Sequence, residues 1–420
     1  MMNSMVQRFH QTDIIIFGRV PIINQLKKEL KIMNDFRFQI PTELIFGKDS
    51  HKNVGAEVKR FANKILMVRL EKDSLNKIGI YDDIIKSLKQ HEIEVIELAG
   101  VLPNPRLSKV REGVQLCKDE NIKFILAVGG GSVLDSVKAI AASVYANADY
   151  WDIVENKVPF QGSLPFGAIM TVPATGSEMN TSCVITNDET NSKVGSRMGF
   201  PSFSILNPDI CKTLPKKRIA QSVVDMLAHA MERYFTNTDG VDLTDRMLEG
   251  VMKTIVRLGT KYYKDGFDYQ TVSQLMYAAT VAHNFSLCVG RTNDFASHQI
   301  GHELSGEYDL PHGESLSILF PSWIKYVRNH NKERIAQFFV NVFNVEPNFL
   351  NIDDTIDRGI TALENFYLSL DMPIRISHTN IKNLDIEKLA NRSSENGTRT
   401  RGNFVELSKD DIIKIFENAM

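Results

Sequence analysis

The sequence predicts an α/β domain with an open, mostly parallel sheet, followed by an all-α domain. Two observations carry this prediction. Short apolar runs alternate with helical stretches up to about residue 208, and long helical periods dominate after it. The 420 residues are 43% hydrophobic and 24% charged, which is an ordinary globular composition. We expect an atypical N-terminal extension at 1–32, an α/β domain at 33–210 and a helical domain at 211–420.

The first half contains apolar runs of strand length, each followed by a helical stretch or a loop. The runs are KILMVRL at 64–70, EVIELAG at 94–100, KFILAVGGG at 123–131 and FGAIMTVPA at 166–174. Helical apolar spacing occurs at 74–91, 107–121 and 132–146. Strands that alternate with such helices form parallel units with right-handed crossovers, which predicts helices on both faces of the sheet.

The second half is predicted to be helical, because apolar residues recur with helical spacing at 216–235, 243–263 and 271–287. The boundary is placed at 208–215, where NPDICKTLP carries two prolines. The extension at 1–32 precedes a second plausible start at Met33 and lacks a small-residue cleavage site, so it is a poor signal peptide. It is either an appendage or an extra hairpin.

Composition excludes several classes of partner. The 49 basic and 51 acidic residues give a net charge of −2, which favours neither nucleic acid nor an anionic membrane. No apolar run approaches the roughly 20 residues of a membrane span. The four cysteines are scattered with no CxxC pair, so we expect free thiols in a reducing compartment, the cytoplasm.

Two loops after predicted strands are candidate ligand sites. AVGGGSVLD at 127–135 joins three glycines to a helix start, where free N–H groups and the helix dipole favour a pyrophosphate. The alternative is a plain tight turn, and the GxGxxG fingerprint is absent. TVPATGSEMNTS at 171–182 follows the next strand and is rich in hydroxyls. It is predicted to be either a second ligand-binding loop at the same edge of the sheet or a capped loop without a ligand.

The turn after the first strand, RLEKDSLNKIG at 69–79, bears on the choice of cofactor. Acidic residues here hydrogen-bond a ribose and repel a 2′-phosphate, and Glu71 and Asp73 are candidates for this role. Arg69 and Lys72 leave the opposite interpretation open, because they could accept a phosphate.

VVDMLAHAMERY at 223–234 places Asp225 and His229 four residues apart, on one helix face within an apolar stretch. A carboxylate is costly to bury there unless a cation or a donor meets it. The pair is therefore either part of a metal site or a satisfied core histidine with an aspartate partner.

The stretch DFASHQIGHELSGEYDLPHGES holds His298, His302 and His312. The first two share a helix face, but a metalloprotease HExxH helix needs a glutamate where this chain has Gln299. A loop with Pro311 allows His312 to return towards the helix. With the earlier aspartate and histidine, one carboxylate and three imidazoles are available without a thiolate, a set that suits Fe(II), Zn, Mn or Co.

Six motifs in order make the chain similar to the iron-containing (group III) alcohol dehydrogenase family, in its butanol dehydrogenase branch. They are IPTELIFGK, NPRLSKV, LAVGGGSVLDSVKAIA, TVPATGSEMN, VVDMLAHAMERY and FASHQIGHELSGEYDLPHGESL, within 33–420. The resemblance implies a dinucleotide-binding α/β domain, a helical metal domain and an active site between them. It also implies hydride transfer between a nicotinamide and an alcohol or aldehyde, helped by a divalent metal, Fe²⁺ or Zn²⁺.

The resemblance implies specific residues. The metal ligands correspond to Asp225, His229, His298 and His312, and His302 corresponds to a histidine that faces the nicotinamide and the substrate. His302 is either a proton relay or substrate-positioning group, or a residue that only packs beside the ligands. The cofactor contacts implied by the resemblance are Asn104, Gly130, Gly131, Ser132, Asp135, Thr171, Thr175, Ser182 and Lys193. The turn after the first strand adds Asp73 and Ser74 as candidates.

The chain departs from the family pattern in four places. EKDS at 71–74 replaces a glycine-rich GxGS turn, and Asp73 makes us expect NAD(H) rather than NADP(H). Ser222 stands for a usual glycine, NP at 207–208 stands for a usual DP, and the extension at 1–32 has no counterpart. By family analogy we expect a homodimer.

Three competing functions are weighed against the dehydrogenase. A metallohydrolase would use the same histidines, but Gln299 and the phosphate cradle oppose it. A metal- and NAD-dependent cyclase or lyase related to dehydroquinate synthase would show no net cofactor turnover. A relative without redox activity is disfavoured by the complete ligand set.

Overall fold

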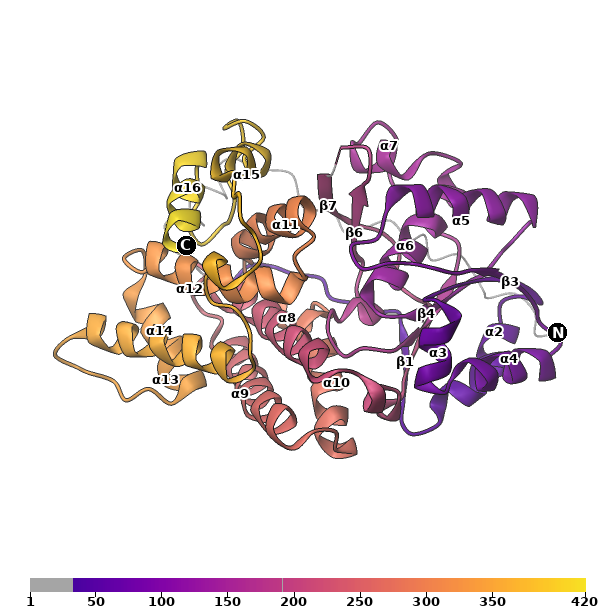
Figure 1. Ribbon diagram of the computed structural model, residues 1–420, viewed down its shortest axis with the longest axis horizontal. Coiled ribbons are helices and arrows are strands. Elements are labelled where there is room, and N and C mark those ends of the chain that lie inside the picture. Colours follow the sequence, from indigo (N-terminus) through magenta and orange to yellow (C-terminus); the bar gives the residue numbers. More distant parts are fainter. Residues whose placement is uncertain (1–32, 191) are drawn as a thin grey trace.

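The structure, a computed structural model, describes residues 33–190 and 192–420; the expected extension at 1–32 lies outside the described residues. Figure 1 shows an α/β half, in indigo to magenta, beside a helical half, in pink to yellow. The predicted fold class is confirmed.

In the described part of the chain, six parallel strands form one open sheet in the order β1-β8-β5-β4-β2-β3. Their bounds are β1 Glu43–Phe46, β2 Lys64–Arg69, β3 Glu94–Leu98, β4 Ile125–Gly129, β5 Phe166–Met170 and β8 Phe203–Leu206. Ala127 of β4 pairs with Val68 of β2 and Ala168 of β5. The loops that follow these strands therefore emerge at the same edge of the sheet, where open α/β sheets bind ligands.

Helices cover both faces of this sheet. Every residue of the central strands β4 and β5 is therefore buried. Helices and hairpin strands of this half have the following bounds: α2 Val54–Lys59, α3 Lys72–Ile78, α4 Tyr81–Gln90, α5 Leu107–Asp119, α6 Gly131–Ala146, α7 Tyr150–Val154, β6 Ser182–Asn187 and β7 Ser192–Arg197. One apolar core lies between the sheet and α2–α4. A second continues from the α5–α6 side into the helical half and joins both halves.

The helical half is built around α8, which packs against α9, α10 and α12. The helices are α8 Lys216–Tyr234, α9 Asp242–Asp265, α10 Tyr269–His283, α11 Ala296–Tyr308, α12 His312–Val327, α13 Lys332–Phe343, α14 Ile352–Ser369, α15 Ile386–Ser393 and α16 Lys409–Asn418. Every residue of α8 from Ser222 to Tyr234 is buried. Among the described helices, none is long and apolar enough to cross a membrane.

The structure corrects two predicted helices. The helix expected at 74–91 is two helices, because Gly79 adopts a left-handed conformation (φ +81°) that ends α3. The helix expected at 271–287 ends at His283, because Phe285 also has a positive φ (+69°). The strands β1, β6, β7 and β8 were not among the predicted strands; all of them are six residues long or shorter.

Candidate metal and cofactor site

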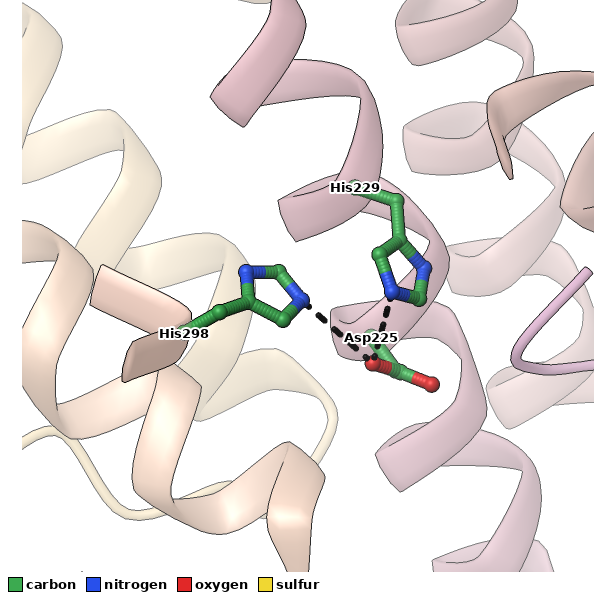
Figure 2. Close-up of side chains that lie close together, drawn as sticks. All are labelled: Asp225, His229 and His298. Carbon is green, nitrogen blue, oxygen red and sulfur yellow. Dashed lines mark ion pairs between the residues drawn. The ribbon is translucent and has the colours of Figure 1, made fainter. Parts of the chain in front are cut away.

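Helix α8 carries the first two candidate metal ligands. Asp225 and His229 lie one turn apart, and their exposed fractions are 5% and 4%. The flanking Val224, Met226 and Ala228 are fully buried, so apolar packing forms the helix and holds both polar side chains inside the protein. Figure 2 shows that His229 of α8 and His298 of α11 each direct a ring nitrogen at the carboxylate of Asp225.

Two further imidazoles reach the same carboxylate from α11 and α12. The Nε2 atoms of His229, His298 and His312 lie 3.8, 3.9 and 3.7 Å from Oδ1 of Asp225. These separations exceed a hydrogen bond, so the side chains converge without bonding one another. The structure thus brings together all four residues that the family resemblance implies as ligands, and their role stays a prediction.

The chemistry of this cluster fits a divalent metal. Oδ1 of Asp225 and Nε2 of His298 are buried and have no hydrogen-bond partner among the residues described. Burial raises the pKa of Asp225 to about 6, which shows how poorly the metal-free site stabilises the carboxylate. Burial also lowers the pKa of the His298 imidazole to about 4 and the pKa values of His229 and His312 well below 6.5. Neutral imidazoles are the metal-binding form.

His302 lies beside the cluster rather than within it. Its ring centroid is 5.2 Å from that of His312, and the structure gives no contact between His302 and Asp225. The side chain is only partly buried, one turn of α11 beyond His298. This is the arrangement that the separate role predicted for His302 requires. Burial lowers the pKa of the imidazole well below 6.5, so it is neutral at pH 7.

Two functional candidates that lie near the candidate metal ligands were not identified from the sequence. Glu232 bonds His298, and His283 packs on His229 with ring centroids 3.9 Å apart. The spacing of Glu232 was a usable signal that it lies near the ligands. It comes seven residues after Asp225 and three after His229, so all three fall on the same helix face. No comparable signal marked His283, which reaches the site from α10.

The glycine turn after β4 forms a cradle at the start of α6. Gly130 is the N-cap in an extended conformation and Gly131 begins the helix. A Cβ at Gly131 would stand 2.6 Å from Cγ2 of Thr175, so only glycine fits between this turn and the next loop. The free N–H groups and the dipole of the 16-residue α6 favour a phosphate here.

The loop 171–182 is fixed against the cradle by a buried lysine. Lys138 Nζ donates to the Ser177 carbonyl (2.8 Å) and hydroxyl (2.7 Å), and to the Ser182 carbonyl (2.8 Å). Within this loop the Thr175 hydroxyl accepts from the Ser177 N–H (3.2 Å), and Thr171 is fully buried. The loop is therefore held rigidly at the sheet edge shared with the glycine turn.

Other predicted cofactor residues fall into two groups. Lys193 Nζ donates to Oδ1 of Asn104 (2.9 Å), whose Nδ2 donates to Asp309 of the helical half (2.8 Å). Burial lowers the pKa of Lys193 to about 8. By contrast, the carboxylate of Asp135 accepts from the Ser177 hydroxyl and the Val184 N–H, both at 3.0 Å. The protein itself thus occupies both oxygens of Asp135.

Four further predicted contacts lie at helix starts or beside the candidate metal ligands. Asp73 and Ser74 are exposed in the first turn of α3. Ser132 lies in the first turn of α6, and its carbonyl accepts from the Ser136 hydroxyl. The hydroxyl of Ser182 lies 3.3 Å from Nε2 of His283, which links the loop 171–182 to the metal cluster.

Comparison with known proteins gives a consistent assignment. The iron-containing alcohol dehydrogenase model matches residues 41–208, and the C-terminal model of the Fe-containing alcohol dehydrogenase family matches 219–420. The chain is 39% identical to the probable NADH-dependent butanol dehydrogenase 1 of Bacillus subtilis, over 92% of this chain and 100% of the relative. It is 31% identical to the NADPH-dependent aldehyde reductase YqhD of Escherichia coli, over the same shares.

A solved structure agrees with these relatives. The NADH-dependent butanol dehydrogenase A of Thermotoga maritima superposes with a TM-score of 0.88 at 33% identity, covering 92% of this chain and 99% of that one. Both family models together span the two halves that hold the cradle and the metal cluster. The chain therefore belongs to the iron-containing alcohol dehydrogenase family, in its butanol dehydrogenase branch.

Proposed function

We propose that the protein interconverts a primary alcohol and its aldehyde, with NAD(H) as the hydride carrier and a divalent metal held by Asp225, His229, His298 and His312. One observation carries the proposal. Three neutral imidazoles converge on one buried carboxylate oxygen that lacks a hydrogen-bond partner within the described chain. A metal held there would lower the pKa of a bound hydroxyl and polarise a carbonyl.

The protein residues supply binding and proton handling. The N–H groups at Gly130, Gly131 and Ser132 suit the pyrophosphate of the cofactor, and Lys193 and Asn104 suit its nicotinamide half. His302 is neutral at pH 7 and stands beside the ligand set, so it can accept or donate the alcohol proton. The apolar packing of α8 keeps Asp225 and His229 inside the protein.

The preference for NADH over NADPH is supported by the turn after β2. Arg69, which could have accepted a 2′-phosphate, is instead bonded to Glu97 and lies 5.4 Å from the centre of the Tyr81 ring. Lys72 also lies over the Tyr81 ring, at 4.8 Å. Asp73 remains exposed, so the turn presents a carboxylate that repels a phosphate and accepts from a ribose hydroxyl.

The test is a panel of aldehydes assayed with NADH and NADPH, on protein whose metal content has been measured. We expect loss of absorbance at 340 nm with butanal-type aldehydes, and a higher kcat/KM with NADH. Net cofactor turnover separates this function from a cyclase or lyase. A strong NADPH preference would refute the role of Asp73, and no oxidation of cofactor with any aldehyde would refute the dehydrogenase itself.

We also propose Fe²⁺ or Zn²⁺ as the metal, because one carboxylate with three imidazoles suits both ions. A cytoplasmic location is supported by four cysteines that are all free thiols. A homodimer is proposed from the family resemblance alone. Elemental analysis of protein purified without chelators tests the metal, and light scattering coupled to gel filtration tests the dimer.

A further inference from the structure

We infer that Glu232 is a positioning residue for the metal site, which fixes both the orientation and the protonated nitrogen of His298. The inference rests on the proposed metal-dependent function. Glu232 lies on α8 with Asp225 and His229, and it is 1% exposed. One side of a single helix thus carries two candidate ligands and a carboxylate that holds the third.

The contact between Glu232 and His298 is made twice through one oxygen. Oε1 of Glu232 lies 2.9 Å from Nδ1 of the His298 ring and accepts the backbone N–H of the same residue, also at 2.9 Å. The two bonds fix both the backbone and the ring of His298. Its other ring nitrogen, Nε2, is then directed at Asp225 Oδ1, 3.9 Å away.

These bonds also determine the tautomer. A backbone N–H can only donate, so Oε1 accepts from His298, and with Glu232 in its ionised form the ring nitrogen that shares this oxygen carries the proton. With Nδ1 protonated, Nε2 of the neutral ring keeps its lone pair, which is the form that binds metal. Histidine ligands in metalloproteins commonly donate their other N–H to a carboxylate, which fixes the ring and raises its basicity.

The start of α11 is shaped around the same carboxylate. Its N-cap residue, Phe295, gives the helix no side-chain cap and holds a positive φ of +63°. Such a conformation is strained for a bulky residue and persists only where the surroundings impose it. The N–H groups of Phe295, Ser297 and His298 all face Glu232, so a residue of α8 serves as the cap of α11.

The experiment compares Glu232→Gln and Glu232→Ala with a matched control, Asp294→Asn. Asp294 is also 1% exposed and accepts the N–H groups of Asn403 and Phe404 at 2.7 Å. It also accepts the N–H of Ala296 at the start of α11 (3.3 Å), but its hydrogen bonds in the structure involve no imidazole. The measurements on each protein are the Zn²⁺ dissociation constant, from competition with a chromogenic chelator, and the absorption spectrum of the Co²⁺-substituted form. The thermal midpoint of the metal-free protein reports any purely structural damage.

We expect Glu232→Gln to weaken Zn²⁺ binding by about tenfold and Glu232→Ala by about 100-fold, with an altered Co²⁺ spectrum. Asp294→Asn should leave both unchanged. Zn²⁺ affinity equal to wild type in Glu232→Ala, or an equal loss in the Asp294 control, would overturn the inference. Absence of metal binding by the wild-type protein would instead overturn the proposed function as well.

A second measurement is made on the unaltered protein, and a variant is needed only to assign the His298 signals. Long-range ¹H–¹⁵N NMR of the metal-free protein, with the His298 signals assigned by comparison with His298→Gln, reports which ring nitrogen carries the proton. We expect the Nδ1-protonated form for His298. The Nε2-protonated form would overturn the inference.

Discussion

At the scale of single residues, Asp225 and His298 provide the sharpest test of the ligand set. Removing either one leaves the remaining ligands too few to hold the ion, so Asp225→Ala and His298→Ala should lose metal and activity together. Elemental analysis of both variants checks this, with circular dichroism as the control for folding. Full metal occupancy in both variants would refute the ligand assignment.

His302 is expected to separate metal binding from turnover. Because its ring contacts His312 and not Asp225, His302→Ala should keep its metal while kcat falls by about 10²- to 10⁴-fold, the usual contribution of a general acid–base group. Metal analysis and steady-state kinetics on the same preparation check both parts. Loss of metal equal to that in His298→Ala would make His302 a ligand.

The sequence limited what could be predicted at this scale. Asp225 and His229 share one helix face, so their proximity followed from spacing alone. His312 joins them only through the fold, and spacing alone would have paired His298 with His302. The bond between Glu232 and His298 spans 66 residues, so local periodicity contains no sign of it.

At the scale of elements, substitutions of two neighbouring glycines test whether the start of α6 binds the cofactor. A methyl group at Gly131 would stand 2.6 Å from Cγ2 of Thr175, whereas at Gly130 the nearest atom, Cγ2 of Val172, is at an ordinary 3.6 Å. Gly131→Ala should therefore displace the loop 171–182 and weaken NADH binding, while Gly130→Ala should not displace it. Fluorescence titration with NADH compares them, and equal affinities would argue against the cradle.

The cap of α7 gives a prediction for stability. Burial alone would raise the pKa of Asp149, but hydrogen bonds from Arg111 and the Trp151 N–H outweigh it and hold the pKa below its usual value of 3.8. The stabilisation is therefore present above about pH 4 and is lost as pH falls through the lower folded-state pKa. Asp149→Asn keeps an oxygen that can accept from the Trp151 N–H but loses the charged pairing with Arg111, so it should lower the free energy of unfolding by about 0.2–1 kcal/mol at pH 7.

Urea unfolding of wild type and Asp149→Asn at pH 7 and pH 3 checks this prediction. The difference between the two proteins should shrink at pH 3, because the wild-type carboxyl then approaches its neutral form. A difference that stays constant with pH would mean that charge at Asp149 is irrelevant. Equal stability at pH 7 would mean that the charged pairing with Arg111 does not stabilise the fold, since asparagine can still accept from the Trp151 N–H.

Elements with a strong apolar period were predicted best. The helix expected at 216–235 is α8 to within one residue, because its buried face repeats over five turns. Strand β7, SKVGSR, is polar and pairs only with β6, so its hairpin has no core pattern to reveal it. Gly79 falls within an apolar period that continues on either side of it, so periodicity alone concealed the break between α3 and α4.

At the scale of the whole molecule, the sequence predicted a parallel open sheet but not its strand order. Strand β1 lies beside β8, about 160 residues away in the chain, where Glu43 pairs with Phe203. The pairing of two strands so far apart in the chain depends on how the complete domain packs. Local sequence patterns carry no information about it. The expected division into an α/β and a helical half followed instead from the change of period after Pro208.

The last prediction concerns residues 1–32. The Bacillus relative aligns over its entire length with 92% of this chain, and all six family motifs lie after residue 32. Met33 packs against Gly290, and the N–H of Asn34 donates to the Gly290 carbonyl (2.8 Å), so a chain that begins at Met33 keeps both contacts. We expect this shortened protein to match the full chain in metal content, thermal midpoint and kcat/KM for NADH. Loss of metal or of folding in the shortened protein would contradict this expectation.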